Sequence, residues 1–423
     1  MIYNPYGKSL NVSSVRLAGG SGSMFRINVD GSKGTLFRNI EIKPKDSLYI
    51  FIAVTIDPTG KNNPIMVSDS VIFETNGNTQ KVQLVAWGQD MHLFKNQIIK
   101  SQTWTADKPY LVLGYLAIDS AQTLTIEAGT KIYFHRSSFL YVAGNINING
   151  TFQQPVVLQG DRLESDFKDI PGQWGAVIIM EGSTGNIVNY AEIRNATVGI
   201  QIGVDSTYLN QDLVLSNTKI LNSSFYGIWA FGSTIHAWND VIADCGQWAL
   251  ALLRGGDYTF THCTVSNQGV LFSNRTQPSL VFSNYIAKTD PKTGGTIIYP
   301  GDLKNANFDN SIIYGNFDNE IGIAQIEQGG IFNFMFDHCL LKISPDLINI
   351  AGSSHFNSII SDKPPAFMKP SDYRFELDSL SAAIDAGSMD YAKLYPLDFK
   401  GNSRISDKGP DLGAYEFIPG GAH

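Results

Sequence analysis

The sequence predicts an all-β protein in two parts, an antiparallel sandwich of short strands followed by a parallel β-solenoid. Residues 1–95 form short alternating apolar runs that end at Gly, Asn, Asp or Pro, and none of them has the 3.6-residue period of a helix. From about residue 110 onward, similar apolar phrases return at fairly regular intervals. The composition, 43% hydrophobic and 17% charged, indicates a chain that is ordered throughout.

The first part is predicted to be one β-domain. Its runs last 4 to 10 residues, as in "LYIFIAVTID" at 48–57 and "QKVQLVAWG" at 80–88. Short strands bounded by turn-forming residues are typical of an antiparallel sandwich. We therefore expect an immunoglobulin-like β-sandwich over residues 1–95, and we assign residues 96–423 to the second part.

The second part is built from pairs of apolar residues separated by one position. Gly or Asn stands between the pairs, where the backbone can turn. Each pair reads as a short strand with two inward side chains, and strands this close together leave no room for crossover helices. Four such pairs follow one another: Leu124/Ile126, Ile132/Phe134, Leu140/Val142 and Ile146/Ile148.

A repeat continues this pattern. Its intervals are 27, 22, 23, 48 and 28 residues, and the doubled interval suggests a copy that drifted near "SLVFSNYIA" at 279–287. Such periods predict a parallel β-solenoid of roughly ten to twelve coils, in which like residues stack about 4.8 Å apart. The central apolar residues of the copies are Ile193, Ile220, Ile242, Val265, Ile313 and Leu341.

A second column lies two residues before the first. Five of its six members are small, as an inward column near a tight corner requires, and the sixth is an aspartate, which predicts a rung shifted by one residue. The two cysteines in it are expected to fill the core, and the histidine before each, His262 and His338, to join an outward stacked column rather than a metal site. The six members are Ala191, Thr218, Asp240, Cys263, Ser311 and Cys339.

Two segments carry a family resemblance. "LTIEAGTKIYFHRSSFLYVAGNININGTFQQPVVLQGDR" at 124–162 resembles the first coils of right-handed parallel β-helix proteins exported by bacteria, which share the pectate-lyase-like solenoid. "SLSAAIDAGSMDYAKLYPLDFKGNSRISDKGPDLGAYEF" at 379–417 resembles their terminal segment. The whole chain is similar to uncharacterised β-helix surface lipoproteins with a sandwich domain in front. The resemblance implies a location outside the cytoplasm, at the cell surface, although "MIYNPYGKSLNVSS" has no signal-peptide pattern.

The C-terminal segment is expected to cap the solenoid. "PDLGAYEF" at 410–417 can close the last coil, with Gly413 at a turn and Tyr415 and Phe417 packed beneath it. In that position Asp411 and Glu416 have structural roles.

The charged loop "QGDRLESDFKDIPGQW" at 159–174 is the candidate catalytic site. Loops on a rigid scaffold often carry function, and Asp161, Arg162 and Glu164 could serve glycoside hydrolysis or a polysaccharide lyase, while the carboxylates could bind calcium. The alternative is a solvated loop in which Arg162 pairs with a neighbouring carboxylate while Trp174 packs over the coil. No aspartate cluster of the kind a calcium-dependent lyase needs stands on the repeated strands, so we expect no metal and no cofactor.

Aromatic residues on two successive coils form the candidate binding site. Aromatic faces bind sugars, so the outward members could form a platform for a glycan, unless they point inward or lie beneath the long 268–310 excursion. The candidates are Tyr226, Trp229, Trp238 and Trp248, with Phe225 and Phe231 beside them.

Several function classes are excluded. The net charge is −8 and the 31 Lys and Arg residues are scattered, which argues against nucleic-acid binding. No apolar stretch is long enough to span a membrane, and no HExxH, GxSxG or phosphate-loop motif occurs. The sequence thus favours a non-catalytic protein that binds a glycan or a surface protein. The alternatives are a polysaccharide lyase or glycoside hydrolase, and a structural spacer.

Overall fold

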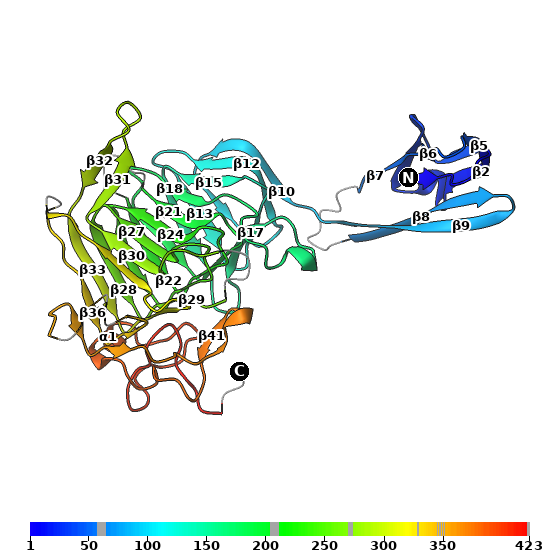
Figure 1. Ribbon diagram of the computed structural model, residues 1–423. Coiled ribbons are helices and arrows are strands. Elements are labelled where there is room, and N and C mark those ends of the chain that lie inside the picture. Colours follow the sequence, from blue (N-terminus) through cyan, green and yellow to red (C-terminus); the bar gives the residue numbers. More distant parts are fainter. Residues whose placement is uncertain are drawn as a thin grey trace. The chain divides into compact units, whose positions relative to one another are not determined.

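The protein is almost entirely β-structure in the computed structural model (Figure 1), which confirms the predicted fold class. The structure describes residues 1–56, 65–203, 211–269, 274–327, 330–344, 346, 348, 350 and 352–420. Within these residues the one α-helix is α1 (Met389–Leu394), and no helix is long and apolar enough to cross a membrane. The chain divides into two compact units, Met1–Met91 and His92–His423.

The first unit contains antiparallel sheets around one apolar core. Buried side chains from both larger sheets meet in this core, among them Val15, Ile27 and Val71. This packing agrees with a sandwich, and the immunoglobulin-like class stays a prediction. One sheet has the order β5 (Leu36–Ile42), β2 (Leu10–Leu17), β8 (Ile65–Thr75), β9 (Asn78–Gly88); the second has β4 (Ser32–Gly34), β3 (Phe25–Val29), β7 (Ile50–Val54); β1 (Ile2–Tyr3) pairs with β6 (Ser47–Leu48).

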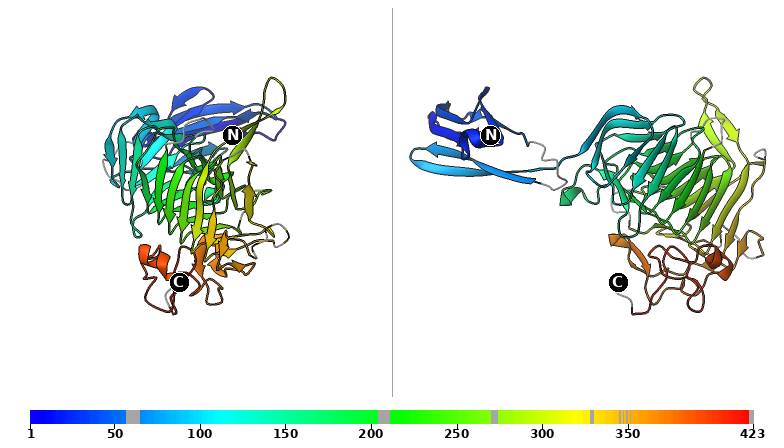
Figure 2. Two further views of the ribbon diagram at one scale, coloured as in Figure 1. Left: turned by 90° about the vertical axis from the view of Figure 1, so that its left-hand side faces the viewer. Right: turned by 180° about the vertical axis from the view of Figure 1, so that it is seen from behind.

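The second unit is a solenoid of three parallel ladders, visible as stacked strands in Figures 1 and 2. It begins with two long strands, β10 (His92–Ile99) and β12 (Tyr110–Ile118), which run across ladders 1 and 2. The predicted boundary at residue 95 therefore falls inside β10. Ladder 3 has ten strands, which gives ten coils.

The strands of each ladder follow the chain order. Ladder 1 continues with β14 (Lys131–Phe134), β17 (Val156–Gly160), β20 (Ala191–Arg194), β23 (Lys219–Leu221), β26 (Val241–Ala243), β29 (Thr264–Asn267), β34 (Ile312–Gly315), β37 (Leu340–Leu341) and β39 (Ile360–Ser361). Ladder 2 continues with β15 (Phe139–Val142), β18 (Val177–Ile179), β21 (Val198–Ile202), β24 (Tyr226–Phe231), β27 (Leu250–Leu253), β30 (Leu280–Ser283) and β35 (Ile321–Ala324). Ladder 3 consists of β11 (Gln102–Trp104), β13 (Thr123–Glu127), β16 (Asn145–Asn149), β19 (Asn186–Asn189), β22 (Asp212–Ser216), β25 (Thr234–Trp238), β28 (Gly256–Thr261), β33 (Leu303–Asp309), β36 (Met335–Asp337) and β38 (Phe356–Asn357).

The register of ladder 1 confirms the predicted repeat. The six central apolar residues pair one after another, from Ile193 with Ile220 to Ile313 with Leu341. The interpretation of the doubled interval was wrong, because Val265 pairs directly with Ile313 and no copy has drifted. The added length holds β30 of ladder 2 and an antiparallel hairpin, β31 (Tyr285–Thr289) with β32 (Thr296–Pro300).

The column two residues earlier is buried at all six positions. Asp240 stays in register, so the predicted shift of that rung was wrong. Its Oδ1 accepts a hydrogen bond of 2.8 Å from the Thr218 N–H, and burial raises the pKa of its carboxyl well above the usual value. Cys263 and Cys339 are free, buried thiols that fill the core as predicted.

The predicted outward histidine column was also wrong. His262 is fully buried, whereas His338 is partly exposed. Because Val265 pairs with Ile313, Asn310 occupies the turn between the two histidines, and its Nδ2 lies 3.3 Å from His262 Nε2.

The C-terminal segment contacts the outer face of ladder 1, whereas we expected it to close the last coil. The Gly413 N–H donates to the Asn310 carbonyl (2.8 Å), and the Ala414 N–H donates to Thr264 Oγ1 (3.1 Å). This face needs covering because most of its outward residues in β23, β26, β34 and β37 are apolar, which the local repeat did not reveal. The buried residues that meet here include Leu221, Val241, Ala243, Ile312 and Leu340 of ladder 1 and Phe375, Leu377, Phe399, Leu412 and Tyr415 of the segment.

Candidate functional site

The charged loop between β17 and β18 keeps its charged groups in local pairs. Arg162 Nε lies 3.1 Å from both carboxylate oxygens of Glu164, and its guanidinium carbon lies 3.7 Å from the ring centroid of Phe167. The hydrogen bond from Arg162 lowers the pKa of the Glu164 carboxyl, so this group is ionised at neutral pH and is unsuited to act as an acid catalyst. Asp161 turns to another partner, with its Oδ2 2.7 Å from His135 Nδ1.

Trp174 fixes the end of this loop. Its ring is buried and stacks on Phe134 with centroids 4.2 Å apart, and its Nε1 donates to the Arg194 carbonyl at 2.8 Å. The arrangement corresponds to the solvated loop that we considered as the alternative. Asp161 and Glu164 share no hydrogen-bond partner, since Asp161 pairs with His135 and Glu164 with Arg162. Within the described residues no group of three or more His, Cys, Asp or Glu could hold a metal ion.

Three of the four aromatic candidates lie together, Tyr226 and Trp229 in β24 of ladder 2 and Trp248 two residues before β27. The ring centroid of Tyr226 lies 5.0 Å from that of Trp229 and 5.3 Å from that of Trp248, with the second pair stacked. Phe225 and Phe231 extend the group at 5.9 Å from Tyr226 and 4.9 Å from Trp229. These five residues are called the aromatic cluster below.

The fourth candidate, Trp238, is not part of the cluster. It ends β25 of ladder 3, and its ring stacks on Tyr395 of the C-terminal segment with centroids 5.0 Å apart. Its role is therefore to pack the segment against the solenoid.

Strand alternation gives the cluster its outward orientation. In β24 the neighbours of Trp229, Ile228 and Ala230, are fully buried in the core, so Trp229 points to the outer face and is partly exposed. Phe225 is 50% exposed, whereas Phe231 is buried. The indole N–H groups of Trp229 and Trp248 are buried and have no hydrogen-bond acceptor among the residues that the structure describes.

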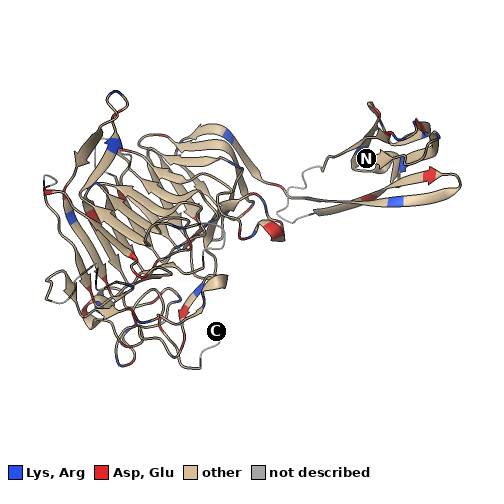
Figure 3. Cartoon of the chain, viewed as in Figure 1, with Lys and Arg blue, Asp and Glu red and all other residues tan. Residues whose placement is uncertain are grey.

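The strands around the cluster carry no charge. From Tyr115 in β12 to Ala324 in β35, the residues assigned to ladder 2 include no Asp, Glu, Lys, Arg or His. Most of the length of the solenoid strands is tan in Figure 3, with blue and red at scattered positions. The face can therefore offer stacking and neutral hydrogen bonds but has no cation on its strands to pair with an acidic ligand.

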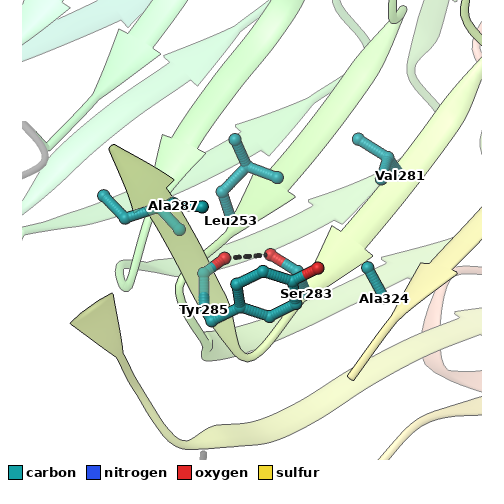
Figure 4. Close-up of a pocket in the computed structure, with 7 residues that line it drawn as sticks. Leu253, Val281, Ser283, Tyr285, Ala287 and Ala324 are labelled. Atoms are coloured by element: carbon teal, nitrogen blue, oxygen red, sulfur yellow. Dashed lines mark hydrogen bonds between the residues drawn. The ribbon is translucent and has the colours of Figure 1, made fainter. Parts of the chain in front are cut away.

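Sequence reasoning missed a second feature of this face, a pocket of about 240 Å³ beside the β31–β32 hairpin (Figure 4). The only sequence signal was the length of the excursion after Val265, which was taken for a drifted repeat. Leu253, Val281, Ser283, Tyr285, Ile286, Ala287 and Ala324 line the pocket.

Comparisons with known families support the solenoid. Residues 96–209 match the model of the pectate-lyase-like beta helix domain, and residues 176–340 match that of the right-handed beta helix region. Comparison of the chain with curated proteins and with solved structures finds no match. The second unit is thus a right-handed parallel β-helix of the pectate-lyase-like type.

Proposed function

We propose that this right-handed parallel β-helix protein binds a neutral glycan through the aromatic cluster and performs no catalysis there. The observation that carries the proposal is that the Tyr226 ring centroid lies 5.0 Å from that of Trp229 and 5.3 Å from that of Trp248, beside strands of ladder 2 that carry no charged residues. Amphipathic rings with a few neutral donors are the usual lining of sites for uncharged organic ligands.

The alternative, a polysaccharide lyase or glycoside hydrolase at Asp161, Arg162 and Glu164, has weaker support. Its Arg162 and Glu164 pair with each other, and its Asp161 pairs with His135. The pectate-lyase-like family match supports the fold of such enzymes, but the same fold hosts many functions.

The cellular setting is part of the same proposal. We place the protein outside the cytoplasm, on the surface of a bacterial cell and anchored as a lipoprotein, with an immunoglobulin-like first unit. The support is the resemblance of residues 124–162 and 379–417 to exported β-helix proteins. Protease treatment of intact cells should then degrade the protein, whereas protection until the cells are lysed would contradict this location.

Affinity electrophoresis in gels that contain neutral or acidic polysaccharides tests the binding. The wild-type protein should be retarded by a neutral polysaccharide, and Trp229→Ala and Trp248→Ala should each weaken retardation by about tenfold or more, the loss of roughly one stacking contact. Trp238→Ala is the matched control, because it removes the same side chain from ladder 3 and should bind as the wild type does.

Two results would refute the proposal. One is binding that Trp229→Ala and Trp248→Ala leave unchanged. The other is the release of reducing ends, or of products with a new double bond, in an assay that Asp161→Asn abolishes, which would establish the enzyme alternative.

A further inference from the structure

A small pocket lies where the C-terminal segment meets ladder 1. Its volume is about 90 Å³, and since one water takes up about 30 Å³, it holds a group of only a few heavy atoms. The rings of Phe152, Tyr190 and Phe399 line it, together with Lys219 and Glu192. The amine nitrogen of Lys219 lies 5.3 Å from the centroid of the Phe399 ring. The pocket therefore places an amine beside an aromatic wall.

Strand pairing and alternation explain the position of this amine. Lys219 pairs with Glu192 of β20 on one side and with Val241 of β26 on the other. Its neighbour Ile220 is fully buried in the core, so the Lys219 side chain points to the outer face. There the C-terminal segment buries Val241 completely and leaves Lys219 half-buried at its border.

The Lys219 amine makes no hydrogen bond or ion pair with the residues that the structure describes. The carboxylates around it are held by other cations. For Glu192 the partner is Arg194, with 3.1 Å between Oε1 and Nε. For Glu376 it is Lys400, with 2.9 Å between Oε1 and Nζ. Lys219 thus carries a half-buried, unpaired amine that lines the pocket.

The neighbouring charges influence how readily this amine gives up its proton. Burial lowers the pKa of the Lys219 amine, and the positive charges of Arg194 and Lys400 lower it further. The carboxylates of Glu192 and Glu376 act in the opposite direction but do not cancel the shift. At neutral pH a larger share of Lys219 than of an exposed lysine is therefore neutral, and only the neutral amine attacks a carbonyl carbon.

We propose that Lys219 is a nucleophile that condenses with small neutral aldehydes in this pocket to form an imine. The amine nitrogen attacks the carbonyl carbon, and the resulting carbinolamine loses the former carbonyl oxygen as water. A C=N bond replaces the C=O bond, both protons of the amine leave in that water, and nothing is oxidised or reduced. The Glu192 carboxylate stabilises the protonated imine and disfavours aldehydes that carry a negative charge. The aromatic cluster shares no residue with this pocket, so the reaction does not depend on glycan binding.

Reductive trapping tests the proposal on the folded, full-length chain. Glycolaldehyde is added with sodium cyanoborohydride, which reduces an imine to a stable secondary amine, and peptide mass mapping measures the modified fraction of every lysine. Lys219 should be modified several-fold faster than Lys131, which is exposed on β14 of the same ladder. Glyoxylate, an aldehyde of similar size with a negative charge, should react more slowly with Lys219 than glycolaldehyde does.

Three variants separate the nucleophile from a merely structural lysine. Lys219→Arg keeps the positive charge but has no such amine, so modification at this position should disappear while the melting temperature stays near that of the wild type. Glu192→Gln removes a carboxylate that raises the pKa of Lys219, so the pH profile of modification should move to lower pH. Lys400→Gln removes a charge that lowers this pKa and should move the profile to higher pH.

The results that would overturn the proposal are equally specific. Modification of Lys219 no faster than that of Lys131 would refute the nucleophile. A pH profile that neither Glu192→Gln nor Lys400→Gln moves would show that the charges around the pocket do not govern the amine. Faster reaction with glyoxylate than with glycolaldehyde would refute the neutral class of aldehyde.

Discussion

The outer faces of ladders 1 and 2 both carry apolar side chains that point away from the core, but the two faces differ in how far these side chains are exposed. On ladder 1 these residues are fully buried, as Val241, Ile312 and Leu340 are, because the C-terminal segment lies on them. On ladder 2 the outward residues Tyr115, Ile178 and Trp229 are partly or largely exposed, although Ala251 beside Trp229 is buried.

The difference indicates what each face is for. A contiguous apolar surface on a protein is normally covered by the chain itself or kept for a partner. Ladder 1 receives a dedicated cover, fastened by a fully buried Arg404 that lies 2.7 Å from Glu416 and donates to Asn239 Oδ1 at 2.9 Å. Ladder 2 combines its aromatic residues with a complete lack of charge, which fits a surface kept for an uncharged ligand.

The largest expected effect on stability comes from removing the ion pair that holds the C-terminal segment on ladder 1. Glu416→Gln leaves the buried Arg404 guanidinium without the carboxylate that lies 2.7 Å away. Burial raises the pKa of the Glu416 carboxyl to about 8, so the pair with Arg404 is charged at pH 9. Removing one partner of a buried ion pair typically costs about 3–5 kcal/mol, so the apparent free energy of unfolding in urea at pH 9 should fall by that amount. Glu164→Gln removes an exposed partner of Arg162 and is the control, with no measurable change expected. Equal stability of Glu416→Gln and the wild type would show that the ion pair does not hold the segment.

A second prediction compares the two faces directly through one substitution. Ile312→Ala on ladder 1 opens a cavity at a fully buried site and should lower the free energy of unfolding by about 2–5 kcal/mol. Ile178→Ala makes the same change on ladder 2, where the side chain is partly exposed, and should cost about 1 kcal/mol or less. Similar losses in the two variants would mean that ladder 2 is covered as ladder 1 is, and the comparison would fail.

The part of this architecture that could be predicted from the sequence is the part set by local alternation. Each strand of ladder 1 presents its central apolar residue to the core, so Ile193, Ile220 and Ile242 could be aligned by their spacing alone. The cover of ladder 1 could not be predicted, because it depends on contacts such as that between Ala414 and Thr264, which lie 150 residues apart. Nothing in a local repeat records which outer face a distant segment will occupy.

The candidate site shows a similar limit. Alternation alone places Tyr226 and Trp229, three residues apart, on opposite faces of a strand. They meet because Tyr226 is the first residue of β24, where the chain has just left a corner and alternation does not yet apply. Trp238 was grouped with them because the sequence does not show to which of the three ladders a given strand belongs.

The smallest expected effect concerns the corner between the two ladders, where Asp244 is buried. Burial raises the pKa of its carboxyl to about 7, so the folded protein holds a proton that the unfolded chain releases near pH 4. Stability contributed by this group is therefore lost as pH rises from the unfolded pKa towards 7. Asp244→Asn removes the titration, and between pH 6 and pH 8 the wild type should lose about 1 kcal/mol more unfolding free energy than the variant does. The Asn side chain keeps an oxygen to accept the Gly269 N–H, now 2.8 Å from Oδ1, so the corner itself should stay intact. Parallel pH profiles of stability for the two proteins would mean that water reaches the Asp244 carboxyl. The corner between the covered face of ladder 1 and the open face of ladder 2 would then be more hydrated than its packing indicates.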